Sequence, residues 1–592
     1  MTVTVRLAWI ILGVLALAPA PAWAQEPADA ALESLFQDYL DAWFSHEPLT
    51  ATRLGDHRFD DRLEDLSAES RAAWVERDRR FLDRLPDRVD YEALSRDGQI
   101  DFEIFRHHLE YALWLAEHFE PFEDDPRTYV GYTTEGVYLL LTQSTLPEAE
   151  NLANAIERIK AVPRIVETAK QTLTGAPRVK VETAILQTRG AIGFYTDDVF
   201  VFANQPQGEG ELAEVAADAA EALQTYLDFL TNELLPDAGD DWRIGPELFA
   251  EKVARELNSG LTAAEVLAEA TAEAERVEQE MAVIARQLWW DMFPGIPVPP
   301  DDPDGRRTLI REVLEQIGQE HGSPESLVTD ARATVASIKA FIDERDILGL
   351  PEPDRCAIIE MPEFMRGNSV AYLNPAPPLD PEGRSEYAIS PPPGDWDDDR
   401  VASFLREYNA RMLQILTIHE AYPGHYVQLE YSNRCPSLIR RVLSSGTFAE
   451  GWAVYTERMM LDEGFGLGDL KLRMQQLKFY LRAVVNAILD HEMHARSMTD
   501  DEAMSLLMDR AFQTEGEAAG KVIRSKQSSA QLSTYFVGRV AFHRLRQAIQ
   551  REQGDAFDLA RFHEATLSHG TLPVKYLPEL VRKSLDMAPA AE

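Results

Sequence analysis

The chain has 592 residues, with 58 lysines and arginines against 100 aspartates and glutamates, and a formal net charge of −42. A phosphate backbone needs a basic surface, so this balance excludes nucleic acid as an expected partner. Only two cysteines occur, Cys356 and Cys435, which excludes a disulfide scaffold, although export would permit a bridge between them.

Residues 1–24 have the pattern of a secretory signal peptide. Arg6 precedes an apolar run over 7–18, and the small-x-small triplet at 22–24 predicts cleavage after Ala24. Two prolines follow the run and argue against an uncleaved membrane anchor, because the run is already short for a bilayer. No cysteine follows the run, so a lipid anchor is not expected.

The mature chain, 25–592, is therefore predicted to be exported, and to be periplasmic or secreted. No later stretch is apolar enough to suggest a membrane span after signal cleavage. The excess of carboxylates is expected to form a solvated surface that keeps the protein soluble.

Most of the mature chain has a helical period. Within 31–44, apolar residues recur at the i, i+3, i+4, i+7 spacing that indicates a half-buried helix. Similar apolar stripes occur in 145–175, 210–235, 262–288, 310–345, 400–420, 470–495 and 528–550.

Two stretches depart from this period. Residues 289–305 are rich in proline and glycine and predict a loop between a helical part, 25–288, and a catalytic part, 306–592. Within 349–400, three short extended runs predict a small β-sheet: Cys356–Met361, Ser369–Asn374 and Tyr387–Ser390. The predicted fold is a mostly α domain, large enough for two lobes, with a small sheet.

The strongest chemical signal is LQILTIHEAYPGHYVQLEY, which contains His419, Glu420 and His425. Zinc peptidases of the HExxH type place two histidines one helical turn apart. Here the second histidine lies six positions on, which would rotate it about 120° away on a regular helix. Pro423-Gly424 predicts a bulge that returns His425 to the position four residues on.

A third ligand is expected from SSGTFAEGWAVYTERMM, where Glu450 and Glu457 lie two helical turns apart. We assign Glu450 as the ligand, because the following Gly451 allows close approach, and Glu457 as a hydrogen-bond acceptor behind a ligand. Two histidines and a carboxylate leave a tetrahedral position open, which is typical of one catalytic Zn²⁺ per chain. Manganese or cobalt could use the same ligands.

Glu420 lies beside His419 and is not needed as a ligand. It is expected to act as general base and acid, taking a proton from a metal-activated water and returning it to the leaving amine. For a lone His-Glu pair, polar residues satisfied within helix packing would be the better explanation. The combined pattern of His419, Glu420, His425 and Glu450 favours a metal site.

The segments HEAYPGHYVQ and FAEGWAVYTE together resemble the bacterial domain-of-unknown-function family numbered 885, regarded as gluzincin metallopeptidases. GNSVAYLNP, LRAVVNAILDHEMHA, YFVG and SHGTLP support the resemblance over nearly the whole mature chain. It implies a mostly α fold similar to helical oligopeptidases and carboxypeptidases, with zinc at the floor of a deep cleft. It does not fix the substrate, and the charged segment at 490–494 departs from the expected pattern.

Asp490 and His494 lie four residues apart on one predicted helix, and Arg482 and Asn486 continue the same face. This polar stripe predicts a cleft wall, in which His494 would stabilise an oxyanion and Asp490 would fix an imidazole. A surface stripe is the alternative interpretation.

Tyr535 and Arg539 are also four residues apart. The Tyr535 hydroxyl could donate a hydrogen bond to the negative charge that develops on the scissile carbonyl in the transition state. Arg539 could hold a substrate carboxylate. Ordinary core packing is the alternative for both. Arg366, just before a predicted strand, is a second candidate for substrate binding, and a peptide could pair with that strand if it lies at a sheet edge.

The leading hypothesis is a zinc peptidase that cleaves short peptides with Glu420 as base. The alternatives are a zinc hydrolase of a non-peptide amide or ester, and a peptide-binding protein with a structural metal. The sequence does not distinguish cleavage at the amino end, at the carboxyl end or inside a peptide, and it does not determine the oligomeric state.

Overall fold

The computed structural model describes residues 27–361, 371–394 and 396–589. Within these ranges the fold is mostly α-helical with one small sheet, as predicted. The predicted signal peptide, 1–24, lies outside the described residues. None of the described helices is both long enough and apolar enough to cross a membrane.

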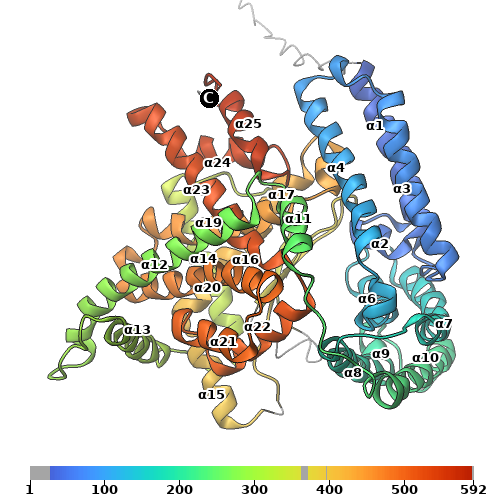
Figure 1. Cartoon of the computed structure of the whole chain (residues 1–592), viewed down its shortest axis with the longest axis horizontal. Helices are drawn as coiled ribbons and strands as arrows, with labels where there is room; N and C mark the ends of the chain where they lie inside the picture. The colour runs from blue at the N-terminus through green and yellow to red at the C-terminus, as the bar shows by residue number, and fades with distance from the viewer. Residues whose placement is uncertain (1–26, 362–370, 395, 590–592) are drawn as a thin grey trace, which may run out of the picture.

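The first ten helices gather on one side of the molecule (Figure 1). The apolar stripe of the first helix is buried, as its period predicts. Their bounds are α1 Pro27–His46, α2 Pro48–Leu54, α3 Ala68–Arg88, α4 Arg96–His118, α5 Pro121–Asp124, α6 Arg127–Thr142, α7 Glu148–Thr172, α8 Arg178–Gly193, α9 Val199–Phe202 and α10 Gly210–Phe229.

The remaining helices form the other side of the molecule, around the long helix α20 (Figure 1). Their bounds are α11 Pro246–Leu257, α12 Ala263–Met292, α13 Pro303–Gly318, α14 Leu327–Arg345, α15 Asp398–Glu407, α16 Ala410–Glu420, α17 His425–Asn433, α18 Leu438–Val442, α19 Gly446–Asp462, α20 Leu470–Ala495, α21 Asp500–Ser505, α22 Glu515–Gln527, α23 Thr534–Gln553, α24 Leu559–Leu567 and α25 Leu577–Ser584.

The hydrophobic core has three parts. One lies among the helices of 63–238, and a second joins α11, α12 and α13 to α20, α21, α22 and α23. The third joins α1, α3 and α4 to α14, α16, α17 and α19 and to the C-terminal helices. The helices α11 and α12 therefore pack with α20, although they precede the predicted loop at 289–305. That loop is shorter than predicted, since α12 runs to Met292 and α13 begins at Pro303.

Three strands make the sheet, in the order β1-β3-β2. They are β1 Cys356–Glu360, β2 Ala371–Asn374 and β3 Ser385–Ile389, which confirms the three predicted extended runs within a few residues. The central strand β3 pairs parallel with β1 and antiparallel with β2. The Tyr387 hydroxyl on β3 lies 3.0 Å from Thr417 Oγ1, which fixes the sheet against α16.

The two cysteines are free thiols in this fold. Cys356 begins β1, and Cys435 is buried just after α17. The bridge that export would permit is not formed.

Candidate metal centre

His419 and His425 lie on two consecutive helices that meet at a sharp break. The helix α16 ends at Glu420 and α17 begins at His425, so the predicted bulge is a complete interruption of the helix. Pro423 cannot continue the helical hydrogen bonds, and a Cβ at Gly424 would collide with the His419 carbonyl oxygen. The break brings the two imidazole rings together, with centroids 4.8 Å apart and planes at 89°.

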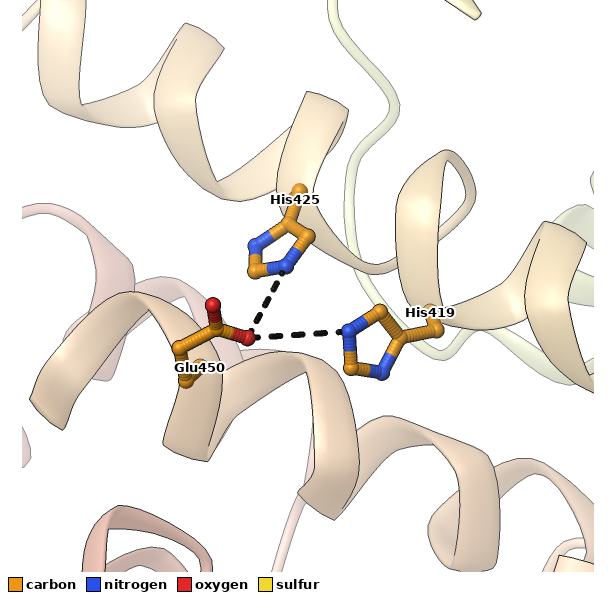
Figure 2. Close-up of side chains that lie close together, drawn as sticks. All are labelled: His419, His425 and Glu450. Carbon is orange, nitrogen blue, oxygen red and sulfur yellow. Dashed lines mark ion pairs between the residues drawn. The ribbon is translucent and has the colours of Figure 1, made fainter. Parts of the chain in front are cut away.

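Glu450 on α19 points at both imidazoles (Figure 2). Its Oε2 atom lies 3.4 Å from His425 Nε2 and 3.7 Å from His419 Nε2. The ligand atoms that these three residues offer all lie within 4.8 Å of one another. The structure therefore brings together the three residues that the sequence assigns as metal ligands.

Glu457 lies two turns after Glu450 on α19. It orients the imidazole of His419 by contacting Nδ1, the ring nitrogen on the side away from Glu450. Its Oε1 atom lies 2.8 Å from His419 Nδ1, and its side chain is fully buried. When Nδ1 donates its proton to this carboxylate, Nε2 is left with a lone pair directed at Glu450. This is the acceptor position predicted for Glu457.

The carboxylates of Glu450 and Glu457 stabilise positive charge at this site. Burial alone would lower the pKa of His419, but Glu450 and Glu457 raise it to about 10. Burial would raise the pKa of Glu450, but hydrogen bonding and charge interaction with His419 and His425 hold it well below its usual range. The same field would stabilise a bound cation.

The spacing of the three side chains fits a divalent cation. Ligand atoms about 2.0–2.1 Å from a tetrahedral ion lie roughly 3.3–3.4 Å from one another, close to the separations of Glu450 Oε2 from the two imidazole nitrogens. The Oε2 atom is buried and lies 3.4 and 3.7 Å from the two imidazole nitrogens, too far for strong hydrogen bonds, as expected of an atom that shares a cation with them. Two imidazoles and a carboxylate suit zinc and leave one position for water or substrate.

The three residues line a pocket of about 360 Å³, together with Glu420. A Glu420 carboxylate oxygen accepts a hydrogen bond from the backbone N–H of Leu373, at 3.2 Å. Leu373 belongs to β2, which is an edge strand of the sheet and also borders the pocket. The deep cleft implied by the family resemblance stays a prediction.

Tyr535 lies in the first turn of α23 and lines the same pocket. Burial raises the pKa of its phenol, and the Glu450 carboxylate adds to the effect. The hydroxyl therefore keeps its proton near neutral pH and can donate a hydrogen bond into the pocket.

The helices α19 and α23 cross in close contact at Gly451 and Gly538. A Cβ on either glycine would collide with the backbone of the other helix. Gly451 therefore admits a neighbouring backbone, and the close crossing fixes Glu450 relative to Tyr535.

His494 does not join the group. Its Nε2 atom lies 2.7 Å from the Ser525 carbonyl oxygen and 2.9 Å from that of Ser528, and its ring stacks on Phe249. Burial lowers the pKa of His494 to about 4. The oxyanion role predicted for this residue is incompatible with its placement, because the N–H is donated to main-chain carbonyls outside the pocket.

Asp490 also lies outside the pocket. Its carboxylate accepts hydrogen bonds from the Ala530 backbone N–H and the Ser533 hydroxyl, both at 3.0 Å. It therefore holds the segment that leads into α23, and the prediction that it fixes an imidazole was wrong. Burial raises its pKa to about 7.

Arg539 points away from the pocket. Its guanidinium stacks over the Tyr480 ring at 4.3 Å, and its Nη1 atom lies 3.5 Å from Glu273 Oε1. The predicted contact with a substrate carboxylate is therefore not available to it. The other candidate, Arg366, lies outside the described residues.

Three other cations border the pocket: Arg482 on α20, and Lys521 and Arg524 on α22. Arg482 was recognised in the sequence only as part of a polar stripe. Lys521 and Arg524 were missed, and their only sequence signal is the three-residue spacing that places them on one helical face.

The comparisons with known proteins identify a family. The family model described as a bacterial protein of unknown function (DUF885) matches residues 48–581, so the chain belongs to that family. No protein among those with curated descriptions matches it.

Two solved structures share its fold. One is "a putative lipoprotein of unknown function" from Shewanella oneidensis, 29% identical, with a TM-score of 0.78, over 93% of this chain and 99% of that one. The other is "the putative lipoprotein" from Colwellia psychrerythraea, 17% identical, with a TM-score of 0.75, over 94% of this chain and 99% of that one.

Proposed function

We propose that this protein is a zinc-dependent hydrolase that cleaves peptide bonds in short peptides. The observation that carries the proposal is the convergence of His419, His425 and Glu450 in one pocket with an additional carboxylate, Glu420. Three protein ligands are typical of a catalytic zinc site, whereas a structural site is usually closed by a fourth.

A divalent cation held by the three ligands would polarise the scissile carbonyl and activate water. Glu420 would take a proton from the attacking water as its oxygen bonds to the carbonyl carbon. The same carboxyl group would return the proton to the amide nitrogen as the C–N bond breaks. The hydroxyl of Tyr535 would donate a hydrogen bond to the oxyanion that develops on the carbonyl oxygen.

An extended peptide is the preferred substrate because β2 borders the pocket. Tyr372, Leu373 and Pro375, on or just after this edge strand, are among the lining residues. An edge strand can pair its backbone with a peptide, and once Glu420 releases the Leu373 N–H this pairing would hold the scissile bond beside Glu420.

The test measures metal content and peptide cleavage on the same preparations. Wild type is expected to hold one zinc per chain, and His425→Ala and Glu450→Gln to lose it, by mass spectrometry of the native protein. Glu420→Gln should keep the zinc and lose cleavage of a mixed-peptide digest. Glu221→Gln, an exposed change on α10, serves as the matched control.

Full zinc occupancy in His425→Ala would overturn the metal site. If zinc is bound as expected but no peptide is cut, the peptidase proposal fails. A hydrolase of another amide or ester, or a peptide-binding protein with a structural metal, would then replace it.

We also propose that the chain is exported. The signal pattern at 1–24 and the description of both structural relatives as putative lipoproteins support this. The absence of a cysteine after the apolar run favours a soluble periplasmic or secreted form. Cell fractionation and the mass of the mature N-terminus test the proposal, and a membrane-retained chain starting at residue 1 would contradict it.

A further inference from the structure

Three positively charged side chains border the candidate metal site. Arg482 comes from α20, and Lys521 and Arg524 come from one face of α22. This is unusual for a chain in which acidic residues outnumber lysines and arginines by 100 to 58. The carboxylates of the same pocket, Glu420, Glu450 and Glu457, lie on α16 and α19, so the positive charge is confined to the α20 and α22 side, which favours an anionic group of a ligand.

Only one of the three cations is neutralised by a carboxylate at close range. Arg482 Nη1 donates to Glu517 Oε1 at 3.1 Å, and Glu517 is not among the residues that line the pocket. Among the described residues, neither Lys521 nor Arg524 has a carboxylate within ion-pair distance. Arg524 donates to Gln531 Oε1 at 2.8 Å and approaches the Tyr535 hydroxyl at 3.5 Å.

Lys521 is the most informative of the three. Only 9% of its surface is exposed, and within the described part of the chain Glu517 and Glu450 act on it only at a distance beyond that of an ion pair. Burial and the charges of Arg482 and Arg524 lower its pKa to about 7. The repulsion from the two arginines is unfavourable for the Lys521 ammonium, and a carboxylate placed between these groups would relieve it.

A fourth polar group lies on the same helix as Arg482. Asn486 on α20 lines the pocket and is 5% exposed. Its amide can hydrogen-bond to the backbone of a bound peptide, and the C-terminal residue of a peptide offers a backbone amide next to its carboxylate.

We propose that Arg482, Lys521 and Arg524 form a subsite for the C-terminal carboxylate of a peptide substrate. The enzyme would then remove residues from the carboxyl end. This inference rests on the proposed peptidase function and adds the substrate class to it. The pocket volume of about 360 Å³ is at the small end for ligand pockets, which suits a chain end.

The experiment compares one peptide in three forms. They are the free acid, the C-terminal amide, and a C-terminal amide whose last residue is replaced by glutamate, so that a side-chain carboxylate is present without a C-terminal one. Initial rates are measured with the zinc-loaded full chain. Wild type is expected to cleave the free acid with a kcat/KM about 10- to 100-fold above that of either amide, because hydrogen bonds to charged groups supply such factors.

The variants locate the subsite. Lys521→Gln and Arg524→Gln are expected to reduce cleavage of the acid at least about tenfold, mainly through KM, and so to narrow or abolish the preference for the acid over the amide. Lys521→Met is a second variant in case glutamine disturbs folding. Lys526→Gln is the matched control, because it removes the same charge from the same helix outside the pocket.

The outcomes separate the two proposals. Equal cleavage of acid and simple amide by wild type would overturn the carboxylate subsite and leave the peptidase function intact. Rapid cleavage of the glutamate-ended amide would assign the cations to an acidic side chain and overturn the C-terminal assignment.

If zinc-loaded wild type cleaves none of the peptides, the proposed function fails. The affinities for the same three peptides, measured by calorimetry, then test whether the subsite binds a C-terminal carboxylate. Tighter binding of the acid, lost in Lys521→Gln, would support the subsite. Equal binding of acid and amide would overturn it.

Discussion

Gly451 of α19 and Gly538 of α23 meet backbone to backbone where the two helices cross. Glu450 immediately precedes the first glycine, and Tyr535 lies one turn before the second. Because neither glycine has a side chain that could adjust, this backbone contact sets the distance between Glu450 and Tyr535.

Gly538→Ala should separate the two helices, because its methyl group would meet the backbone of Thr447 and Gly451. Overpacking of this kind costs about 1–3 kcal/mol, so the melting temperature should fall and zinc binding should weaken as Glu450 moves. Gly190→Ala is the control, since a Cβ there meets nothing within 4 Å and should be neutral or slightly stabilising. An unchanged melting temperature and zinc affinity in Gly538→Ala would argue against the role of the crossing.

Glu457→Gln should weaken metal binding without abolishing it. Glutamine can still accept the proton of His419 Nδ1 but removes the negative charge that makes the imidazole a better ligand. We expect the zinc Kd to rise roughly 10- to 100-fold, measured by competition with a chromophoric chelator. Glu221→Gln should have no effect, and a loss of less than twofold in Glu457→Gln would show that the charge is unimportant.

Tyr535→Phe should lower kcat and leave KM and zinc content nearly unchanged. Removal of one donor to an oxyanion typically reduces kcat by about 10²–10³-fold. Steady-state kinetics on the peptide that wild type cleaves best give the comparison. A kcat near that of wild type would show that the hydroxyl does not contact the reacting carbonyl.

Asp490→Asn should change how stability depends on pH. The pKa of this buried carboxyl is raised to about 7, against 3.8 in an unfolded chain. The folded state keeps the proton where the unfolded state has released it, so the stability contribution is complete below pH 3.8 and is lost as the pH rises to about 7. Asparagine does not titrate, so the variant should gain on the order of 3 kcal/mol relative to wild type between pH 4 and pH 8.

Thermal unfolding of the metal-free protein at a series of pH values measures this difference. Asp237→Asn, at an exposed position, is the control and should follow wild type throughout. If the melting temperatures of Asp490→Asn and wild type change in parallel with pH, the Asp490 carboxyl titrates in the folded protein as it does in the unfolded chain.

The sequence predicted those parts of the fold that depend on local pattern. The bounds of α20 were predicted as 470–495 and agree with the structure, because apolar positions recur through the whole segment. The three metal-ligand candidates were found because each lies in a short motif with its own spacing. The helix break at Pro423-Gly424 was located correctly, although its geometry was not.

The positions that were missed depend on how helices pack. The stripe from Arg482 to His494 spans 12 residues, or about 18 Å of helix. Only Arg482 and Asn486 reach the pocket. Arg539 and Lys521 are both cations on amphipathic helices, and only the rotation of each helix in the folded protein decides which one faces the site.

The core that joins α1, α3 and α4 to residues 327–587 has a consequence for synthesis of the chain. The apolar faces of these three helices leave the ribosome several hundred residues before the segments that cover them. An N-terminal fragment would therefore expose a large apolar surface, which promotes aggregation of partly made chains. The protein should depend on a chaperone during translation more strongly than a helical protein whose core is made of neighbouring helices.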